Sequence, residues 1–225
     1  MAKRLREGVR WIDGTGVNAY LLRDSGTTTL VDAGTVFDAD RIAAAIEATG
    51  TDGIDRILVT HYDADHVGAI GRLPTDAPIY IGRGDAGHLS GDERPPWRSL
   101  KGLTQRLSGP LVPDIPGLRD RLVAVDNGDE IGGFDAYHTP GHTPGHTVYV
   151  HEKRQAAFLG DLVIERNGSL RPAPWFLCRD IGRLRDSLRT LADRAPPFEA
   201  AAMGHGLPFS SDGRKRLRTL AESVR

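Results

Sequence analysis

The sequence predicts a mixed α+β protein, and three observations support this class. Short apolar segments rich in β-branched residues recur between turn signals, as strands do. Longer segments such as 180–195 carry apolar residues at helical spacing. The chain has 225 residues, 39% of them hydrophobic and 26% charged, so it can bury a sizeable core. We therefore predict one domain over residues 1–225.

The first sixty residues predict three antiparallel strands, a helix and a fourth strand. Turn residues separate the strands, and Gly50 ends the helix, whose N-cap lies near Asp38. These elements cover 9–12, 17–22, 27–32, 38–49 and 55–60.

The rest of the chain predicts further strands and two closing helices. A turn signal at 126–129 predicts that 121–125 and 134–138 form a pair of strands. The other strands are expected at 77–81, 148–150, 155–161 and 198–203, and the helices at 180–195 and 210–224.

The segment from about 82 to 120 predicts an irregular insertion, because it is rich in Gly, Pro, Arg and Asp. Such a segment acts as a lid or binding loop or is disordered, and 99–107 within it has a helical pattern. Trp97 is interpreted either as a substrate platform or as an aromatic that packs the insertion onto the body. His88 is expected at the surface.

The cluster His61-Tyr62-Asp63-Ala64-Asp65-His66 predicts a metal site. It follows the strand 55–60 and precedes a helix that opens near Asp65, so its side chains are held at a fixed corner. A tight loop would point His61 and Asp63 one way and Asp65 and His66 another, which suggests two metal positions. Imidazole nitrogen and carboxylate oxygen suit zinc, iron or manganese. The alternative is a solvated polar loop.

Two prolines and two glycines predict that 139–147 is a rigid loop. We interpret His142 as a metal ligand, because a ligand needs a fixed position. His146 is expected to support a ligand or the loop, while His138 and His151 are expected to lie at strand ends.

Two later residues complete the predicted ligand set. Asp161 follows a strand and Gly160, and its carboxylate has an oxygen for each of two cations. His205 lies between glycines at the end of the strand 198–203. Asp32 also follows an apolar strand, and it is interpreted either as a cap for local backbone N–H groups or as a support for a ligand.

Charge and composition narrow the functional classes. The net charge of -1 gives no general attraction to nucleic acid or anionic membrane. Cys178 is the single cysteine, which excludes an intramolecular disulfide and a zinc-cysteine knuckle. No signal-peptide or membrane-spanning run is seen, so a cytoplasmic protein without a membrane partner is expected.

The order of these motifs resembles the metallo-β-lactamase superfamily, whose central motif is His-x-His-x-Asp-His. The resemblance covers almost the whole chain. It includes Asn18–Leu22, Val31–Gly34, the central cluster, Thr139–Thr143, Gly160-Asp161 and Gly204–Gly206.

The resemblance implies a four-layer αβ/βα sandwich in which two mixed sheets are flanked by helices. It also implies a dinuclear site. His61, Asp63 and His142 would serve the first metal, and Asp161 would bridge to the second. The second metal would be bound by Asp65, His66 and His205.

Asp63 departs from the family motif, which has a histidine there. With three carboxylates, two divalent ions and one hydroxide the site is neutral, whereas the usual set leaves one positive charge. Oxygen ligands shift preference towards iron or manganese, although zinc is the first expectation. Because aspartate is shorter than histidine, the first metal would be weakly held or absent, so one or two ions are expected. The diiron flavoproteins of the superfamily have glutamate at this position, but the chain has no room for their flavodoxin domain.

The function expected from the resemblance is that of a metal-dependent hydrolase. A metal-bound hydroxide would attack a small-molecule lactone, ester or thioester, with Asp65 orienting the hydroxide and passing its proton to the leaving group. The alternatives are a phosphodiesterase, an iron-dependent redox enzyme of the same superfamily, and a catalytically silent metal-binding protein. The insertion with Trp97, and 172–176 with Trp175, are candidate substrate walls, or they pack the domain or a dimer interface.

Overall fold

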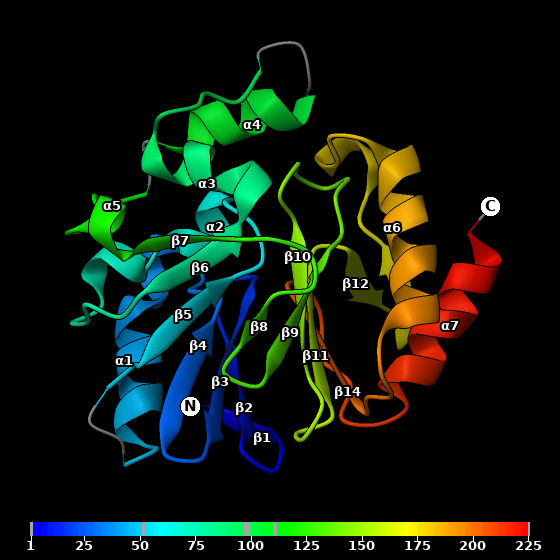
Figure 1. The fold of residues 1–225 in the computed structure, drawn as a ribbon, viewed down its shortest axis with the longest axis horizontal. Helices are drawn as coiled ribbons and strands as arrows, with labels where there is room; N and C mark the ends of the chain where they lie inside the picture. Colours follow the sequence, from blue (N-terminus) through cyan, green and yellow to red (C-terminus); the bar gives the residue numbers. More distant parts are fainter. Residues whose placement is uncertain (1, 51–52, 97–99, 110–111, 225) are drawn as a thin grey trace.

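The first of two facing β-sheets in the computed structural model contains seven strands, and their spatial order follows the sequence (Figure 1). The structure describes residues 2–50, 53–96, 100–109 and 112–224. The strands from the first to the fourth pair antiparallel, and those from the fourth to the seventh pair parallel. They are β1 (Lys3–Arg6), β2 (Val9–Asp13), β3 (Asn18–Asp24), β4 (Thr27–Val31), β5 (Arg56–Val59), β6 (Ile79–Gly82) and β7 (Leu122–Val125).

The second sheet contains five strands, and β11 pairs parallel with β14 at one edge. The other pairings in this sheet are antiparallel. In spatial order the strands are β14 (Ala200–Met203), β11 (Ala156–Gly160), β10 (Thr147–His151), β9 (Phe134–His138) and β8 (Glu130–Ile131). A separate hairpin consists of β12 (Val163–Arg166) and β13 (Ser169–Pro172).

Helices flank both sheets, and α4 (Leu100–Ser108) lies beyond the end of the sheets rather than on an outer face (Figure 1). On the side of the first sheet these are η1 (Val36–Asp38), α1 (Ala39–Glu47), α2 (Ala64–Val67), η2 (Ile70–Arg72), α3 (Arg83–Ser90), α4 (Leu100–Ser108) and α5 (Leu118–Arg121). On the side of the second sheet they are η4 (Trp175–Leu177), α6 (Ile181–Arg194) and α7 (Gly213–Ser223). Among the described residues, no helix has the length and apolarity needed to cross a bilayer.

Strand alternation produces three apolar layers. Leu21 of β3 packs with Ile42 of α1 in the core outside the first sheet, whereas its neighbour Tyr20 faces the second sheet. The Tyr20 and Phe158 rings meet edge to face between the sheets, with centroids 5.5 Å apart. Leu188 of α6 lies in the third core, outside the second sheet. The fold is therefore the four-layer αβ/βα sandwich expected from the resemblance.

Three features of the fold differ from the sequence predictions. Strands β7 and β9 do not pair, because residues 126–129 cross from the first sheet to the second. Helices α3 and α5 in or at the end of the segment 82–120 were not predicted, whereas α4 agrees with the helical pattern of 99–107. Strand β1 and the β12–β13 hairpin were not predicted.

The carboxylate of Asp38, which precedes α1, joins two loops in a buried network. It accepts hydrogen bonds from the backbone and hydroxyl groups of Thr15 and Thr35 at 2.7–2.9 Å, and from Arg41 at 3.2 Å. Burial alone would raise the pKa of Asp38, but the Thr35 and Thr15 hydrogen bonds lower it below the ordinary value. The network fixes Thr35 and the chain around it.

We expect Asp38→Ala to lower the free energy of unfolding by about 3 kcal/mol, because it removes a buried carboxylate that accepts several partly buried hydrogen bonds. Since the folded pKa is depressed, this contribution is present above pH 3.8 and is lost as the pH falls through the folded pKa. Urea unfolding at pH 7 and pH 3 measures both effects. The exposed Asp40→Ala control should change stability by less than about 1 kcal/mol. A pH-independent difference between wild type and Asp38→Ala would contradict the assignment.

Candidate metal centre

The predicted metal ligands lie at the ends of strands that meet along one edge of the two sheets. The His61–His66 corner joins β5 to α2, and His142 lies on the loop between β9 and β10. Asp161 directly follows β11, and His205 follows β14, the parallel neighbour of β11. Because these strands end at the same edge, residues far apart in sequence become neighbours.

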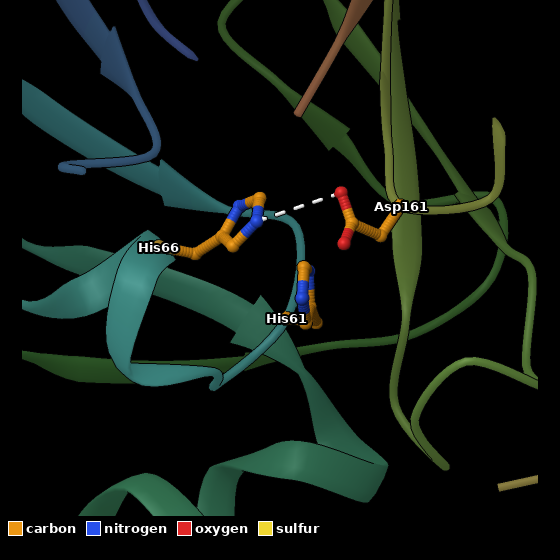
Figure 2. Close-up of side chains that lie close together, drawn as sticks. All are labelled: His61, His66 and Asp161. Atoms are coloured by element: carbon orange, nitrogen blue, oxygen red, sulfur yellow. Dashed lines mark ion pairs between the residues drawn. The ribbon is translucent and has the colours of Figure 1, made fainter. Parts of the chain in front are cut away.

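The structure brings all seven predicted ligands together in three overlapping groups. Within each group, one ligand atom from each residue lies within 4.8 Å of the others. Figure 2 shows the central group, in which His61 and His66 come from the corner and Asp161 comes from the opposite sheet. The groups are His61–His66–Asp161, His61–Asp63–His142 and Asp65–His66–His205.

Within the part of the chain that the structure describes, three buried polar atoms of this centre make no hydrogen bond: His61 Nε2, His66 Nε2 and Asp161 Oδ1. His61 Nε2 does lie 3.2 Å from Asp63 Oδ2, as an ion-pair contact. An unsatisfied buried polar atom is costly, so a native fold retains such atoms where something else binds them. His66 Nε2 lies 3.5 Å from Asp161 Oδ1, and the two point toward each other (Figure 2). The donor types and their convergence fit a divalent cation.

Asp32 orients His66. Its carboxylate lies 2.9 Å from His66 Nδ1 and accepts hydrogen bonds from the backbone and hydroxyl groups of Thr60 at 2.8 Å. The Thr60 hydroxyl in turn lies 3.0 Å from His61 Nδ1. With their Nδ1 atoms engaged, both imidazoles direct Nε2 into the centre. Of the two interpretations of Asp32, the contacts favour support of a ligand.

Replacing Asp32 with asparagine is expected to lower Zn²⁺ affinity by about 10- to 100-fold, as loss of a partner behind a ligand histidine does. Asp32 has φ = 54°, and asparagine tolerates this left-handed backbone, so the substitution mainly removes charge. Competition with a chromophoric chelator measures the affinity. An unchanged value would mean that Asp32 only holds Thr60.

Asp65, His66 and His205 form the half of the centre that is more open to solvent, with 41% of the Asp65 side chain and 32% of the His205 side chain exposed. His205 Nδ1 lies 2.7 Å from the Gly16 carbonyl oxygen, so Nε2 faces Asp161 Oδ2 at 3.3 Å and Asp65 Oδ2 at 3.5 Å. We call these three residues, together with Asp161, the open half.

The carboxylates create a strongly negative field in this half. Burial alone would lower the pKa of His66 and His205, but Asp32 and Asp161 raise that of His66 to about 9, and Asp161 raises that of His205 to about 11. Burial would raise the pKa of Asp161, but His205 and His66 hold it well below the ordinary value. A field that retains protons on imidazoles also attracts a divalent cation.

Asp63 and His142 form a more enclosed half, and Lys101 of α4 reaches into it. The Lys101 ammonium donates to Asp63 Oδ2 and lies 2.7 Å from His142 Nε2. Gln105, one turn later on α4, donates to Asp63 Oδ1 at 2.7 Å. Burial and Lys101 lower the pKa of His142 to about 4. Cys178 Sγ lies 4.0 Å from His142 Nδ1, and burial raises the pKa of this thiol to about 12.

The rigid loop that carries His142 is held in place by residues 143–146, which directly follow this ligand. His146 Nε2 accepts from the Asp161 backbone N–H at 3.1 Å, so His146 supports a predicted ligand. Asp85 of α3 is fully buried and accepts from the Thr143 hydroxyl and the Gly145 N–H, both at 2.6 Å. Burial raises the pKa of Asp85 to about 6.

A cleft of about 400 Å³ opens onto the centre. Its lining combines ligand residues with polar α4 residues and the apolar side chains Val36, Phe37 and Leu177. Trp175 precedes Leu177 and is 71% exposed, outside the cleft lining. Trp97 lies outside the described residues.

Lys101, Gln105 and Asp85 were missed as residues of the centre. Lys101 and Gln105 are four positions apart, which places them on one helix face, but this spacing does not show that the face is buried. His88 was expected at the surface, but it stacks on Tyr62 with ring centroids 4.6 Å apart, and 7% of its side chain is exposed. His138 and His151 end β9 and β10, as expected.

Comparison with known proteins identifies the same superfamily that the sequence motifs resemble. The family model described as the metallo-beta-lactamase superfamily matches residues 12–205. The uncharacterized protein YobT of Bacillus subtilis (strain 168) is 28% identical, with 93% of this chain and 88% of that protein covered.

Two solved structures share the fold. The protein TTHA1623 in a di-iron-bound form is 28% identical with a TM-score of 0.65, covering 89% of this chain and 93% of that one. The B3 metallo-beta-lactamase BLEG-1 is 25% identical with a TM-score of 0.67, covering 92% and 95%.

The matched range contains the strands from β3 to β14, the His61–His66 corner, the His142 loop, Asp161 and His205. It therefore includes every residue of the centre and the strands that these residues follow. The chain belongs to the metallo-beta-lactamase superfamily.

Proposed function

We propose that this chain is a metal-dependent hydrolase that cleaves the ester-like bond of a lactone, an ester or a thioester. The observation that carries the proposal is the convergence of three unsatisfied buried donor atoms, on His61, His66 and Asp161, beside a cleft of about 400 Å³. A small molecule fits a cleft of this size.

His66, His205, Asp161 and Asp65 would hold a divalent ion, since their donor atoms face one another in the open half. Such an ion supplies Lewis-acid polarisation of a carbonyl and activates water at neutral pH. Asp32 and the Gly16 carbonyl keep the two imidazoles in the required orientation.

Asp65 is placed to move the proton in the reaction. Its carboxylate lies in the cleft lining and is partly exposed, so it can meet both water and substrate. A divalent ion held beside Asp65 would favour its charged form, so the carboxylate would stay ionised and able to accept a proton. It would then deliver that proton to the leaving group.

The cleft wall supports a substrate with an apolar part. Phe37 is 78% exposed and lines the cleft together with Val36 and Leu177. An exposed aromatic side chain next to a polar centre suits an acyl chain or ring bound beside a reactive carbonyl.

The test begins with elemental analysis of protein purified without added metal, followed by a panel of lactones, esters, thioesters, phosphodiesters and β-lactams. We expect hydrolysis of a lactone, an ester or a thioester. This activity should be lost when the metal is chelated and return when metal is added, and His66→Ala should be inactive. The exposed Asp186→Asn on α6 serves as a control that should remain active. Hydrolysis that survives both chelation and His66→Ala, or a silent panel with the metal bound, contradicts the proposal.

A second candidate is an iron-dependent redox enzyme. The three carboxylates favour iron more than the family's usual set does, and the TTHA1623 structure is described as di-iron-bound. Iron as the main metal after purification, visible absorption and oxygen consumption without hydrolysis would favour this candidate.

A further inference from the structure

A lysine lies where two of the predicted ligands would share a cation. Lys101 is 4% exposed, and its ammonium contacts both Asp63 Oδ2 and His142 Nε2. Gln105 Nε2 donates to the other oxygen of Asp63. Asp63 and His142 therefore already have hydrogen-bond partners.

A metal ion bound at the same position would lie beside the Lys101 ammonium. Asp63 Oδ2 and His142 Nε2 are 3.1 Å apart. An ion bound to both would lie about 2.0–2.2 Å from each. The Lys101 nitrogen approaches the same two atoms, so an added ion would lie next to a positive charge in a buried site, where repulsion is strong.

The open half differs in this respect. His66 Nε2 and Asp161 Oδ1 are buried and have no hydrogen-bond partner. Among the described residues His61 Nε2 makes no hydrogen bond, although it lies 3.2 Å from Asp63 Oδ2. It belongs both to the group with Asp63 and to the group with His66 and Asp161. One side of the centre is thus satisfied by protein donors, while the other retains free ligand atoms.

Helix α4 is turned to bring Lys101 inward. Its buried residues include Lys101 and Gln105, whereas Leu100, Leu103 and Leu107 are 54%, 37% and 71% exposed. This is the reverse of the usual orientation of a surface helix. Lys101 also lies in the first turn, where the helix dipole disfavours a cation. The contacts with Asp63 and His142 offset both costs.

We propose that the Lys101 ammonium takes the place of one of the two cations, so that the chain binds a single divalent ion through Asp65, His66, His205 and Asp161. This inference rests on the proposed use of these residues as metal ligands.

The test is Zn²⁺ stoichiometry, measured by titration calorimetry and by elemental analysis after dialysis, on metal-stripped wild type, Lys101→Met and Lys101→Gln. Wild type is expected to bind one ion per chain. Both variants are expected to bind two, because Asp63 and His142 lose the lysine ammonium and can bind a second ion together with His61. The exposed helical Lys215→Met serves as the matched control and should bind one.

Two ions or none bound to wild type would overturn the inference, and this result needs no variant. The inference would also be overturned if the wild type and a folded Lys101 variant each bind one ion. If Lys101→Met does not fold, Lys101→Gln is used in its place. Hydrolysis by a two-ion wild type would leave the proposed function intact. A wild-type protein that binds one ion but is inactive on the substrate panel would support this inference and contradict the proposed function.

Discussion

Asp161→Ala is expected to lower Zn²⁺ affinity by about 1,000-fold or more. Loss of a residue that only supports a ligand costs 10- to 100-fold, and Asp161 offers a charged donor directly. Its Oδ1 is an unsatisfied buried atom, and its Oδ2 lies 3.3 Å from His205 Nε2. Removing the carboxylate also removes the negative charge that His66 and His205 face.

The affinity is measured by chelator competition, with circular dichroism to confirm that the variant folds. Asp186→Asn, on the surface of α6, provides the control and should bind as wild type does. An Asp161→Ala protein that folds and binds Zn²⁺ within tenfold of wild type would show that the ion lies elsewhere.

Asp65→Asn is expected to lower kcat by about 100- to 10,000-fold, the range attributed to general acid–base catalysis. Asparagine keeps the shape of the side chain and an oxygen atom for the metal, but its amide cannot accept a proton at neutral pH. Zn²⁺ content and KM should change little, because His66, His205 and Asp161 remain. The acidic limb of the pH–rate profile should be lost.

Zn²⁺ content and the pH profile separate this role from a purely structural one. If the ion is lost in parallel with activity, Asp65 acts as an essential ligand. If kcat stays within a few-fold of wild type, Asp65 does not move the proton.

The metal centre was predictable from the sequence because each ligand follows a strand. His61, Asp161 and His205 each come directly after an apolar run, and strands of one sandwich end at shared edges. Local patterns therefore located the residues, and the resemblance supplied their grouping.

The pairing of β7 with β9 was wrong for a physical reason. The turn at 126–129 is typical of a hairpin, but Val125 and Phe134 both belong to the core between the two sheets. Two strands that face each other across that core have the same apolar pattern as two that pair side by side. Sequence alone does not separate these arrangements.

Lys101 was missed because apolar spacing is a guide to the buried face of a helix only when the helix covers a hydrophobic core. Helix α4 covers a charged centre instead. Its leucines therefore predict the wrong face, and its polar residues are the buried ones. Finding Lys101 required the position of Asp63 in three dimensions.

The most direct measurement is anomalous diffraction at the zinc absorption edge from crystals of the Zn²⁺-loaded chain. We expect a peak within about 2.0–2.2 Å of donor atoms from His66, His205 and Asp161. Fully loaded crystals without a peak between these residues, or with the peak at another place on the chain, would contradict the assignment of this edge of the sandwich as the metal centre.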